Sequence, residues 1–500
     1  MRVILKGHDY KYAVEQMLLT LFPEERPVYE GDGENRITLS LSRGNIWLTA
    51  TAVLHWQGKI TRHACRAKVS ELNGEELNDG RVCQRILKLA FYRAGVEALG
   101  KEPPWGAMTG VRPVKIPTKA MLAGATPAQA KAVLRNAYRV SPLRADLAMD
   151  CAKASLAVKQ SLKPEEISLY VGIPFCPTRC AYCSFISADV KHSLKLIDPF
   201  VDALVREIAA AGAALKREGL SVKSVYFGGG TPTTLSAEQL ERVLGALAEH
   251  IDLSHSVEYT VEAGRPDTIT REKLAVLTKY TVDRVSVNPQ TMEDNVLRAM
   301  GRAHTAKQIE DAYRLVRGSG NFLVNMDLIA GLPADTAEGF RRTLDRVLEM
   351  APENITVHTL ALKKGSTLMS GAFVNPLPDA QQVAEMLDYA WHRLAGAGYI
   401  PYYLYRQKFM SGSFENVGWC KPGCESVYNI CMMEELQSIL SLGGGGVTKL
   451  VDTAAGSIER RANPKYPHEY LDRIDQICHE KEEIPWPISC RKSTSASGKM

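Results

Sequence analysis

The chain has 500 residues, long enough for two to four domains. Apolar residues make up 45% and charged residues 23%, which is typical of a globular protein and excludes a mainly disordered chain. The net charge is only +5, so the composition does not favour a nucleic-acid partner. Charged residues interrupt the first twenty positions, and no apolar run approaches the ~20 residues that span a bilayer. We therefore expect a cytoplasmic protein with no membrane span.

The first third of the chain predicts a small α+β unit followed by helices. Short apolar runs at 37–41 and 47–51 are typical of strands, and residues 83–98 follow a helical pattern. Residues 118–162 read as mostly helical, with Thr126 and Pro127 as the N-cap and first residue of one helix. We therefore expect residues 1–164 to form an N-terminal α+β and helical extension.

From residue 165 the pattern alternates between β-branched runs and amphipathic helices. Six strands separated by helices favour parallel pairing through βαβ crossovers, two units short of a complete (β/α)8 barrel. The sequence thus predicts an α/β fold, a partial (β/α)6 barrel over 165–375. The predicted strands are 168–175, 223–227, 256–262, 283–288, 322–329 and 354–361, and the predicted helices are 196–217, 236–250, 270–279, 305–317 and 336–350.

The last part of the chain predicts a covering domain and a tail. Residues 376–490 read as mostly helical, apart from the aromatic segment 399–405. The glycine run 443–446 predicts a loop near the site. The small, polar residues 491–500 predict a disordered tail.

The strongest feature is a cysteine loop directly after the first strand of the predicted barrel. Cys176, Cys180 and Cys183 follow the spacing C-x3-C-x2-C, which puts three thiolates on one short loop. Three cysteines can hold a four-iron, four-sulfur cluster with one iron open to another ligand, whereas the ferredoxin arrangement uses four. Zinc is the alternative, although it prefers a fourth Cys or His, and no nearby residue in the sequence supplies one.

Cysteines also form a second, looser group near the C-terminus, Cys420, Cys424 and Cys431. Its spacing, C-x3-C-x6-C, matches no pattern that would justify a second cluster. Free cysteines are common in protein cores. We interpret this group as core residues.

Polar residues follow or end the later strands of the predicted barrel. In such folds the carboxyl ends of the strands form the edge where chemistry occurs. We therefore expect these residues to lie near the cysteine loop. They are the glycine segment 228–233, Glu262, Gln290, Asp327 and His358, of which His358 is more typical of a core histidine than of a catalyst.

The cysteine spacing followed by Gly-Gly-Gly-Thr-Pro at 228–232 resembles the radical S-adenosylmethionine (SAM) superfamily. The longer strings at 170–176 and 226–233 resemble the oxygen-independent coproporphyrinogen III oxidases, also called coproporphyrinogen dehydrogenases. Segments 261–267 and 405–408 are similar to the longer HemZ-type branch of that family. One departure is that Gly264 and Arg265 precede a proline where the family often has Asn or Asp.

The resemblance implies roles for the matched residues. Cys176, Cys180 and Cys183 would bind a [4Fe-4S] cluster. Tyr170 would point into the site, and we count it, with Glu262 and Arg406, among the catalytic candidates. Tyr182 would pack near the adenine of SAM, and Gly229, Gly230 and Thr231 would contact its amino group. Arg302 would pair with the SAM carboxylate, and Asp327 would bind the ribose hydroxyls. Glu262 and Gln290 would also contact SAM.

The resemblance also implies a reaction, the conversion of coproporphyrinogen III to protoporphyrinogen IX in haem biosynthesis. A SAM-derived 5′-deoxyadenosyl radical would take hydrogen from two propionate groups, each of which then loses carbon dioxide. Arg406, which follows the aromatic segment, would pair with a propionate of this porphyrinogen substrate. Further expected partners are a reductase or flavodoxin-type electron donor, an unidentified electron acceptor, and one or two SAM molecules. A haem-binding chaperone and a radical SAM enzyme with another substrate are the alternatives.

Overall fold

The computed structural model describes residues 1–31, 33–183, 188–189, 193–363, 366–369, 376–407, 414–487 and 490. The chain divides into two compact units, Met1–Met149 with Arg406–Phe414, and Asp150–Tyr405 with Glu415–Met500. The domain boundaries expected after residues 164, 375 and 490 stay predictions. The tail predicted to be disordered, 491–500, lies outside the described residues.

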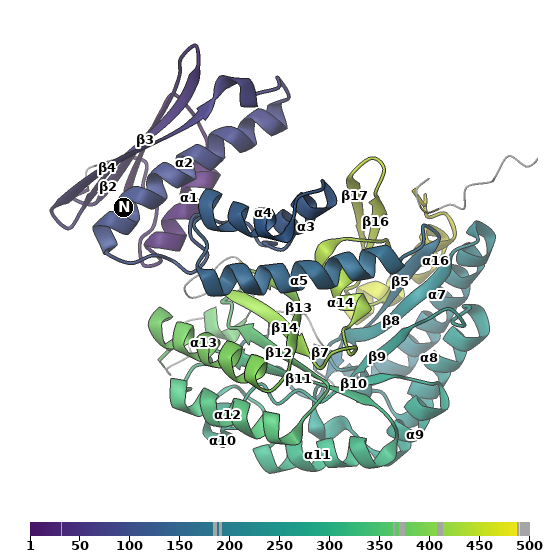
Figure 1. The fold of residues 1–500 in the computed structure, drawn as a ribbon. Coiled ribbons are helices and arrows are strands. Elements are labelled where there is room, and N and C mark those ends of the chain that lie inside the picture. The colour runs from purple at the N-terminus through teal and green to yellow at the C-terminus, as the bar shows by residue number, and fades with distance from the viewer. Residues whose placement is uncertain are drawn as a thin grey trace, which may run out of the picture. The chain divides into compact units, whose positions relative to one another are not determined.

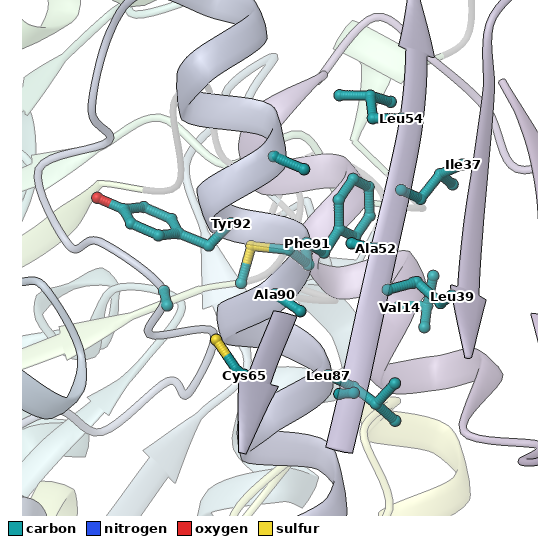
Figure 2. Packing of buried hydrophobic residues seen from close by; sticks show 14 of the residues in the cluster. Val14, Ile37, Leu39, Ala52, Leu54, Cys65, Leu87, Ala90, Phe91 and Tyr92 are labelled. Atoms are coloured by element: carbon teal, nitrogen blue, oxygen red, sulfur yellow. The ribbon is translucent and has the colours of Figure 1, made fainter. Parts of the chain in front are cut away.

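The smaller unit contains a four-stranded sheet packed against helices α1 (Lys11–Leu21) and α2 (Glu76–Leu99). Alternate residues of β3 are buried, as expected for a sheet with one face on a core. Figure 2 shows Leu87 and Phe91 of α2 facing Ile37 and Leu39 of β2. The strands, in their spatial order, are β1 (Arg2–Lys6), β2 (Arg36–Arg43), β3 (Trp47–Trp56) and β4 (Lys59–Lys68).

Three further helices follow the sheet, as predicted: α3 (Lys115–Leu122), α4 (Pro127–Ala132) and α5 (Pro142–Ser161). The Thr126 side chain accepts a hydrogen bond from Gln129 N, and Pro127 is the first residue of α4. The predicted cap is therefore confirmed. The chain crosses from the smaller to the larger unit within α5.

The larger unit is built on a sheet of eleven described strands, of which seven neighbours run parallel in the order β12-β11-β10-β9-β8-β5-β15. Their near-continuous burial is typical of parallel strands that are covered on both faces. The first six strands of the chain in this group are those predicted from the sequence. They are β5 (Glu166–Ile173), β8 (Ser221–Gly229), β9 (Glu258–Glu262), β10 (Arg284–Ser286), β11 (Leu323–Ala330) and β12 (Asn354–Thr359).

Helices cover the outer side of this parallel sheet (Figure 1). Each predicted helix is present, and Ser236 forms the expected capping box with Gln239 at the start of α8. The sheet is open rather than a closed barrel, in agreement with the predicted partial barrel. The helices are α7 (Ile197–Glu218), α8 (Ala237–His250), α9 (Arg271–Lys279), α10 (Asp294–Ala299), α11 (Ala306–Ser319) and α12 (Ala337–Met350).

The region after 376 contains the expected helices but also five strands that join the sheet. β15 (Ile439–Gly443) adds a seventh parallel strand beside β5. The other strands are β13 (Ile400–Arg406), β14 (Glu415–Cys420), β16 (Val447–Asp452) and β17 (Ser457–Ala462), and the helices are α13 (Ala380–Gly396), α14 (Val427–Glu434), α15 (Pro467–Asp472) and α16 (Ile474–Glu482). Among the helices of the described chain, none is long and apolar enough to cross a membrane.

A buried carboxylate on α7 joins the C-terminal elements to the parallel sheet. Glu207 has no exposed surface, and its Oε2 accepts hydrogen bonds from Gly443 N (2.7 Å) and the Tyr470 hydroxyl (2.6 Å). Its Oε1 accepts from Asn463 Nδ2 at 2.8 Å and lies 3.4 Å from the ammonium of buried Lys481. Glu207 therefore fixes the glycine loop 443–446, whose Gly444 N donates to Gly172 O at the end of β5.

Replacement of Glu207 by Ala should lower the free energy of unfolding by about 3–5 kcal/mol, because the buried Lys481 ammonium loses its ion-pair partner and three hydrogen-bond donors lose an acceptor. The matched control is Asp202→Ala on the same helix, since Asp202 forms an exposed pair with Arg242 worth less than about 1 kcal/mol. Denaturant unfolding of the cluster-free protein measures both variants. Equal losses in the two variants would contradict this role for Glu207.

Candidate active site

The cysteine loop lies at the carboxyl end of β5, where Cys176 closes the short strand β6 (Phe175–Cys176). The Cys176 Sγ is 3.4 Å from the Thr231 hydroxyl, which follows β8. The backbone of Ala181 donates to Met300 O at 3.0 Å, and its carbonyl accepts from the Thr367 hydroxyl, also at 3.0 Å. Segments that follow β8, β10 and β12 therefore hold the loop.

Arg302 fixes this loop to two neighbouring strand ends. It is only 4% exposed, and its Nη1 donates to the Tyr182 hydroxyl at 2.8 Å. Its Nη2 donates to Gly264 O (2.9 Å) and Asn288 O (2.8 Å), and its Nε donates to His304 Nε2 (3.2 Å). Four hydrogen bonds thus use most of the five N–H groups of the guanidinium. The predicted contact with the SAM carboxylate stays a prediction. In addition, the hydrogen bonds of Arg302 hold the cysteine loop in place.

The glycine segment after β8 packs directly on the cysteine loop. Gly230 N donates to Ile173 O at 2.8 Å, and Thr231 N donates to Phe175 O at 2.7 Å. A Cβ atom added to Gly230 would lie 2.4 Å from Phe175 O, so this approach requires glycine. A bound ammonium is a hydrogen-bond donor, so it would contact acceptors of the segment, its carbonyl oxygens or the Thr231 hydroxyl.

Gln290 has a left-handed backbone, with φ of +67°, which is uncommon for a residue other than glycine. Its N–H donates to Asp327 O (2.8 Å) and its carbonyl accepts from Ile329 N (3.0 Å). These bonds to β11 hold the strained conformation. Strain of this kind is concentrated at functional sites.

Three stacked tyrosines and a carboxylate line the same end of the sheet. The Tyr226 ring stacks on Tyr428 with ring centroids 4.5 Å apart, and Tyr170 stacks on both. The Tyr226 hydroxyl donates to Glu262 Oε1 at 2.5 Å. Burial raises the pKa of Glu262 to about 7, against the opposing effect of the Tyr226 hydrogen bond. Glu262 therefore changes charge near neutral pH.

Asp327 lies in the same polar region as Glu262. Its Oδ1 accepts from Asn325 Nδ2 at 2.8 Å, and its Oδ2 lies 3.8 Å from His358 Nε2. Burial alone would raise the pKa of Asp327, but the hydrogen bond and charge of His358 outweigh it, so the pKa lies below its usual value. Asp327 is thus a carboxylate near neutral pH, as a contact to ribose hydroxyls requires. His358, whose Nδ1 is 3.5 Å from the Tyr405 hydroxyl, has partners on both ring nitrogens.

Arg406 belongs to the smaller unit by its contacts. It is 5% exposed, its Nη1 donates to Met108 O (2.6 Å) and Gly110 O (3.4 Å), and its guanidinium lies over the Trp105 ring. Through these contacts Arg406 stabilises the fold of the smaller unit. The predicted pairing with a propionate stays a prediction, and Lys408, in the same segment, lies outside the described residues.

The second cysteine group lies at the other end of the strands, where Cys420 is the register partner of Asn354 at the start of β12. Cys420 and Cys431 have no exposed surface, and burial raises the pKa of both thiols. Neutral, buried thiols agree with the interpretation as core residues.

Sequence reasoning missed Arg265 and Tyr428. Arg265 is 3% exposed, and its Nη1 donates to Cys180 Sγ at 3.7 Å. Its place just after Glu262 was visible in the sequence, but only as a departure from the family pattern. Tyr428 has no sequence signal, since it reaches Tyr170 and Tyr226 from the distant helix α14.

The residues present fit an iron–sulfur cluster. Among the described side chains, no three from Cys, His, Asp and Glu converge closely enough to hold a single metal ion. The cysteines of a four-iron cluster ligate different irons, so they lie further apart than the ligands of one zinc ion. Three soft thiolates, with a buried N–H donor on one sulfur, are the environment that such clusters use.

Comparisons with known proteins extend the likeness beyond the motifs. The family model described as Radical SAM superfamily matches residues 170–347. The chain is 40% identical to the oxygen-independent coproporphyrinogen-III oxidase-like protein HemZ of Bacillus subtilis, over 96% of this chain and 97% of HemZ. It is 32% identical to the haem chaperone HemW of Lactococcus lactis, over 56% of this chain and 68% of HemW.

Among solved structures, the coproporphyrinogen III oxidase HemN of Escherichia coli, described as a radical SAM enzyme, is similar to this chain with a TM-score of 0.51 and 25% identity. The alignment covers 67% of this chain and 72% of HemN. The likeness supports the radical SAM fold that the strand order indicates.

Replacement of Glu262 by Gln should change stability in a pH-dependent way. The pKa of Glu262 is about 7 in the folded protein against 4.5 ordinarily, so the wild type loses stability as pH rises between these values. At pH 8 we expect the Gln variant to be more stable by about 1–3 kcal/mol, and at pH 5 the difference should largely disappear. Chemical unfolding at both pH values measures this. An equal difference at pH 5 and pH 8 would contradict the raised pKa.

Replacement of Asp327 by Ala should weaken SAM binding roughly tenfold to a hundredfold, because it removes a charge-assisted contact worth about 1.5–3 kcal/mol. The iron content should stay unchanged. Arg302→Ala should weaken SAM binding and also reduce the iron content, since Arg302 holds Tyr182 within the cysteine loop. Asp345→Ala, which removes a half-exposed carboxylate on α12, is the control. Equilibrium dialysis gives the affinities, and unchanged SAM binding in Asp327→Ala would refute the assignment.

Proposed function

Because this chain belongs to the family of oxygen-independent coproporphyrinogen-III oxidase-like proteins in the radical SAM superfamily, we propose that it converts coproporphyrinogen III to protoporphyrinogen IX. Membership in the superfamily implies a [4Fe-4S] cluster and SAM. When bound, the two would supply a 5′-deoxyadenosyl radical able to take hydrogen from a substrate propionate. One observation carries the proposal: the three-cysteine loop shares one edge of the sheet with Glu262 and Asp327.

The chain's own residues would position the cofactors. Cys176, Cys180 and Cys183 would ligate the cluster, since three cysteines leave one iron available to SAM. The ionised Asp327 would accept hydrogen bonds from ribose hydroxyls. Glu262, above its pKa of about 7, would attract the positive charge of SAM.

A porphyrinogen substrate carries carboxylates, which need cations in the site. We propose Lys363, at the end of the β12 segment, as one of them. Burial lowers its pKa, and the charge of the Cys183 thiolate acts in the opposite direction, so Lys363 lies close to the cysteine loop. A partly buried ammonium gains more from a carboxylate than a solvated one does. Aromatic side chains such as Tyr170 would cover the reacting atoms and exclude water.

A haem chaperone is the second candidate, because the chain covers 68% of the HemW of Lactococcus lactis at 32% identity. The two functions differ in one product. An oxidase releases carbon dioxide from the propionate groups, whereas a chaperone binds haem and releases none. The similarity to HemZ, which extends over 96% of this chain, favours the oxidase-like function.

The test is anaerobic turnover of coproporphyrinogen III labelled in the propionate carboxyl groups, with SAM and a chemical reductant. We expect two labelled carbon dioxide molecules per substrate from the wild type. Cys180→Ala should release none, because it lacks a cluster ligand, and Cys420→Ala, the matched control at a core thiol, should react as the wild type does. Tight haem binding without release of carbon dioxide would contradict the oxidase function and support the chaperone function. A single zinc ion in the purified protein would contradict both.

A further inference from the structure

Arg265 brings a buried positive charge to one of the three cysteines. The turn after β9 places its guanidinium beside Cys180, with Nη1 3.7 Å from the Sγ. Its Nε lies 3.3 Å from Asp267 Oδ1. Its Nη2 is buried and, within the described chain, has no hydrogen-bond partner. This nitrogen is therefore still available as a hydrogen-bond donor.

The turn itself is firmly held. The carbonyl of Arg265 accepts from the Thr268 backbone (3.0 Å) and from the Thr268 hydroxyl (2.7 Å). The Thr268 hydroxyl also bonds to Thr233, in the segment that follows β8. These hydrogen bonds fix the turn that carries Arg265.

A second buried arginine lies in the same part of the site. Arg302 donates at 2.8 Å to the hydroxyl of Tyr182, two residues after Cys180 in the cysteine loop. The direct N–H donor to the Cys180 sulfur is Arg265. Of the three cysteines, Cys180 is the most buried, with 9% of its surface exposed.

Little negative charge offsets Arg265. The carboxylate that contacts it, Asp267, is 40% exposed, so solvent screens that pair. The neighbouring His304 is neutral at physiological pH, since burial and the charges of Arg302 and Arg265 lower its pKa to about 3. The guanidinium charge is thus only partly offset where it meets the sulfur.

We propose that Arg265 raises the reduction potential of the cluster held by Cys176, Cys180 and Cys183, through its N–H···S bond and its charge on Cys180. Reduction adds one negative charge to the cluster. A nearby cation and hydrogen bonds to the sulfurs stabilise that charge, and the effect is large where solvent is excluded. Arg265 is a positioning and tuning residue, outside the SAM contacts. The inference rests on the proposed function only for the presence of the cluster.

The test compares Arg265→Gln, Arg265→Lys and the wild type, each with a reconstituted cluster and without SAM. At a fixed solution potential, the ratio of reduced to oxidised cluster measured by electron paramagnetic resonance should be about tenfold lower in the Gln variant, which corresponds to about 59 mV for one electron. The Lys variant keeps the charge and should lie within about threefold of the wild type. Arg271→Gln removes an exposed charge at the start of α9 and should change nothing. A Gln variant that is reduced as readily as the wild type would overturn the proposal.

If Arg265→Gln fails to hold a cluster, a measurement on the wild-type protein tests the proposal instead. Protein labelled with ¹⁵N-arginine should show hyperfine coupling between an arginine nitrogen and the reduced cluster, and Arg265→Lys should lose that coupling. Absence of an arginine coupling in the wild type would overturn the proposal. A wild type without any iron–sulfur cluster would instead contradict the proposed function, so the two failures are distinguishable.

Discussion

Parallel pairing of seven neighbouring strands is the constraint on which the candidate site depends. Because these strands point the same way, their carboxyl ends lie on one edge, and residues distant in the sequence meet there. Cys176 follows β5, Glu262 ends β9 and Asp327 belongs to β11. Arg302 then connects the cysteine loop to the ends of β9 and β10 through the carbonyls of Gly264 and Asn288. Loss of the parallel register would separate all of these groups.

Charge is distributed unevenly along this edge. The buried guanidinium groups of Arg265 and Arg302 lie on the side of the cysteine loop, where thiolates and a reduced cluster carry negative charge. The carboxylates of Glu262 and Asp327 are close enough to influence each other, and Glu262 accepts a hydrogen bond from the stacked Tyr226. Membership in the superfamily implies a [4Fe-4S] cluster and SAM, and the assignment of these residues to the two cofactors stays a prediction.

Much of this arrangement could be predicted from the sequence. The six strands from β5 to β12 could be predicted because β-branched runs alternate with capped helices. The residues at the ends of these strands could be predicted from their match to the family motifs. β15 was not predicted, since it is short, ends in glycines and is defined by pairing with the distant β5. The contact between Arg265 and Cys180 depends on a turn that no periodicity encodes. The hydrogen bonds from Arg406 to backbone carbonyls could not be predicted either, because side-chain types do not indicate where the backbone lies.

We infer that the cysteine loop holds a four-iron cluster with one iron available to SAM. Electron paramagnetic resonance of the anaerobically reduced protein, recorded before and after addition of SAM, tests this inference. We expect the signal of a reduced [4Fe-4S] cluster whose g values change when SAM binds to the open iron. A cluster signal that SAM leaves unchanged, or a protein that holds zinc in place of iron, would contradict it.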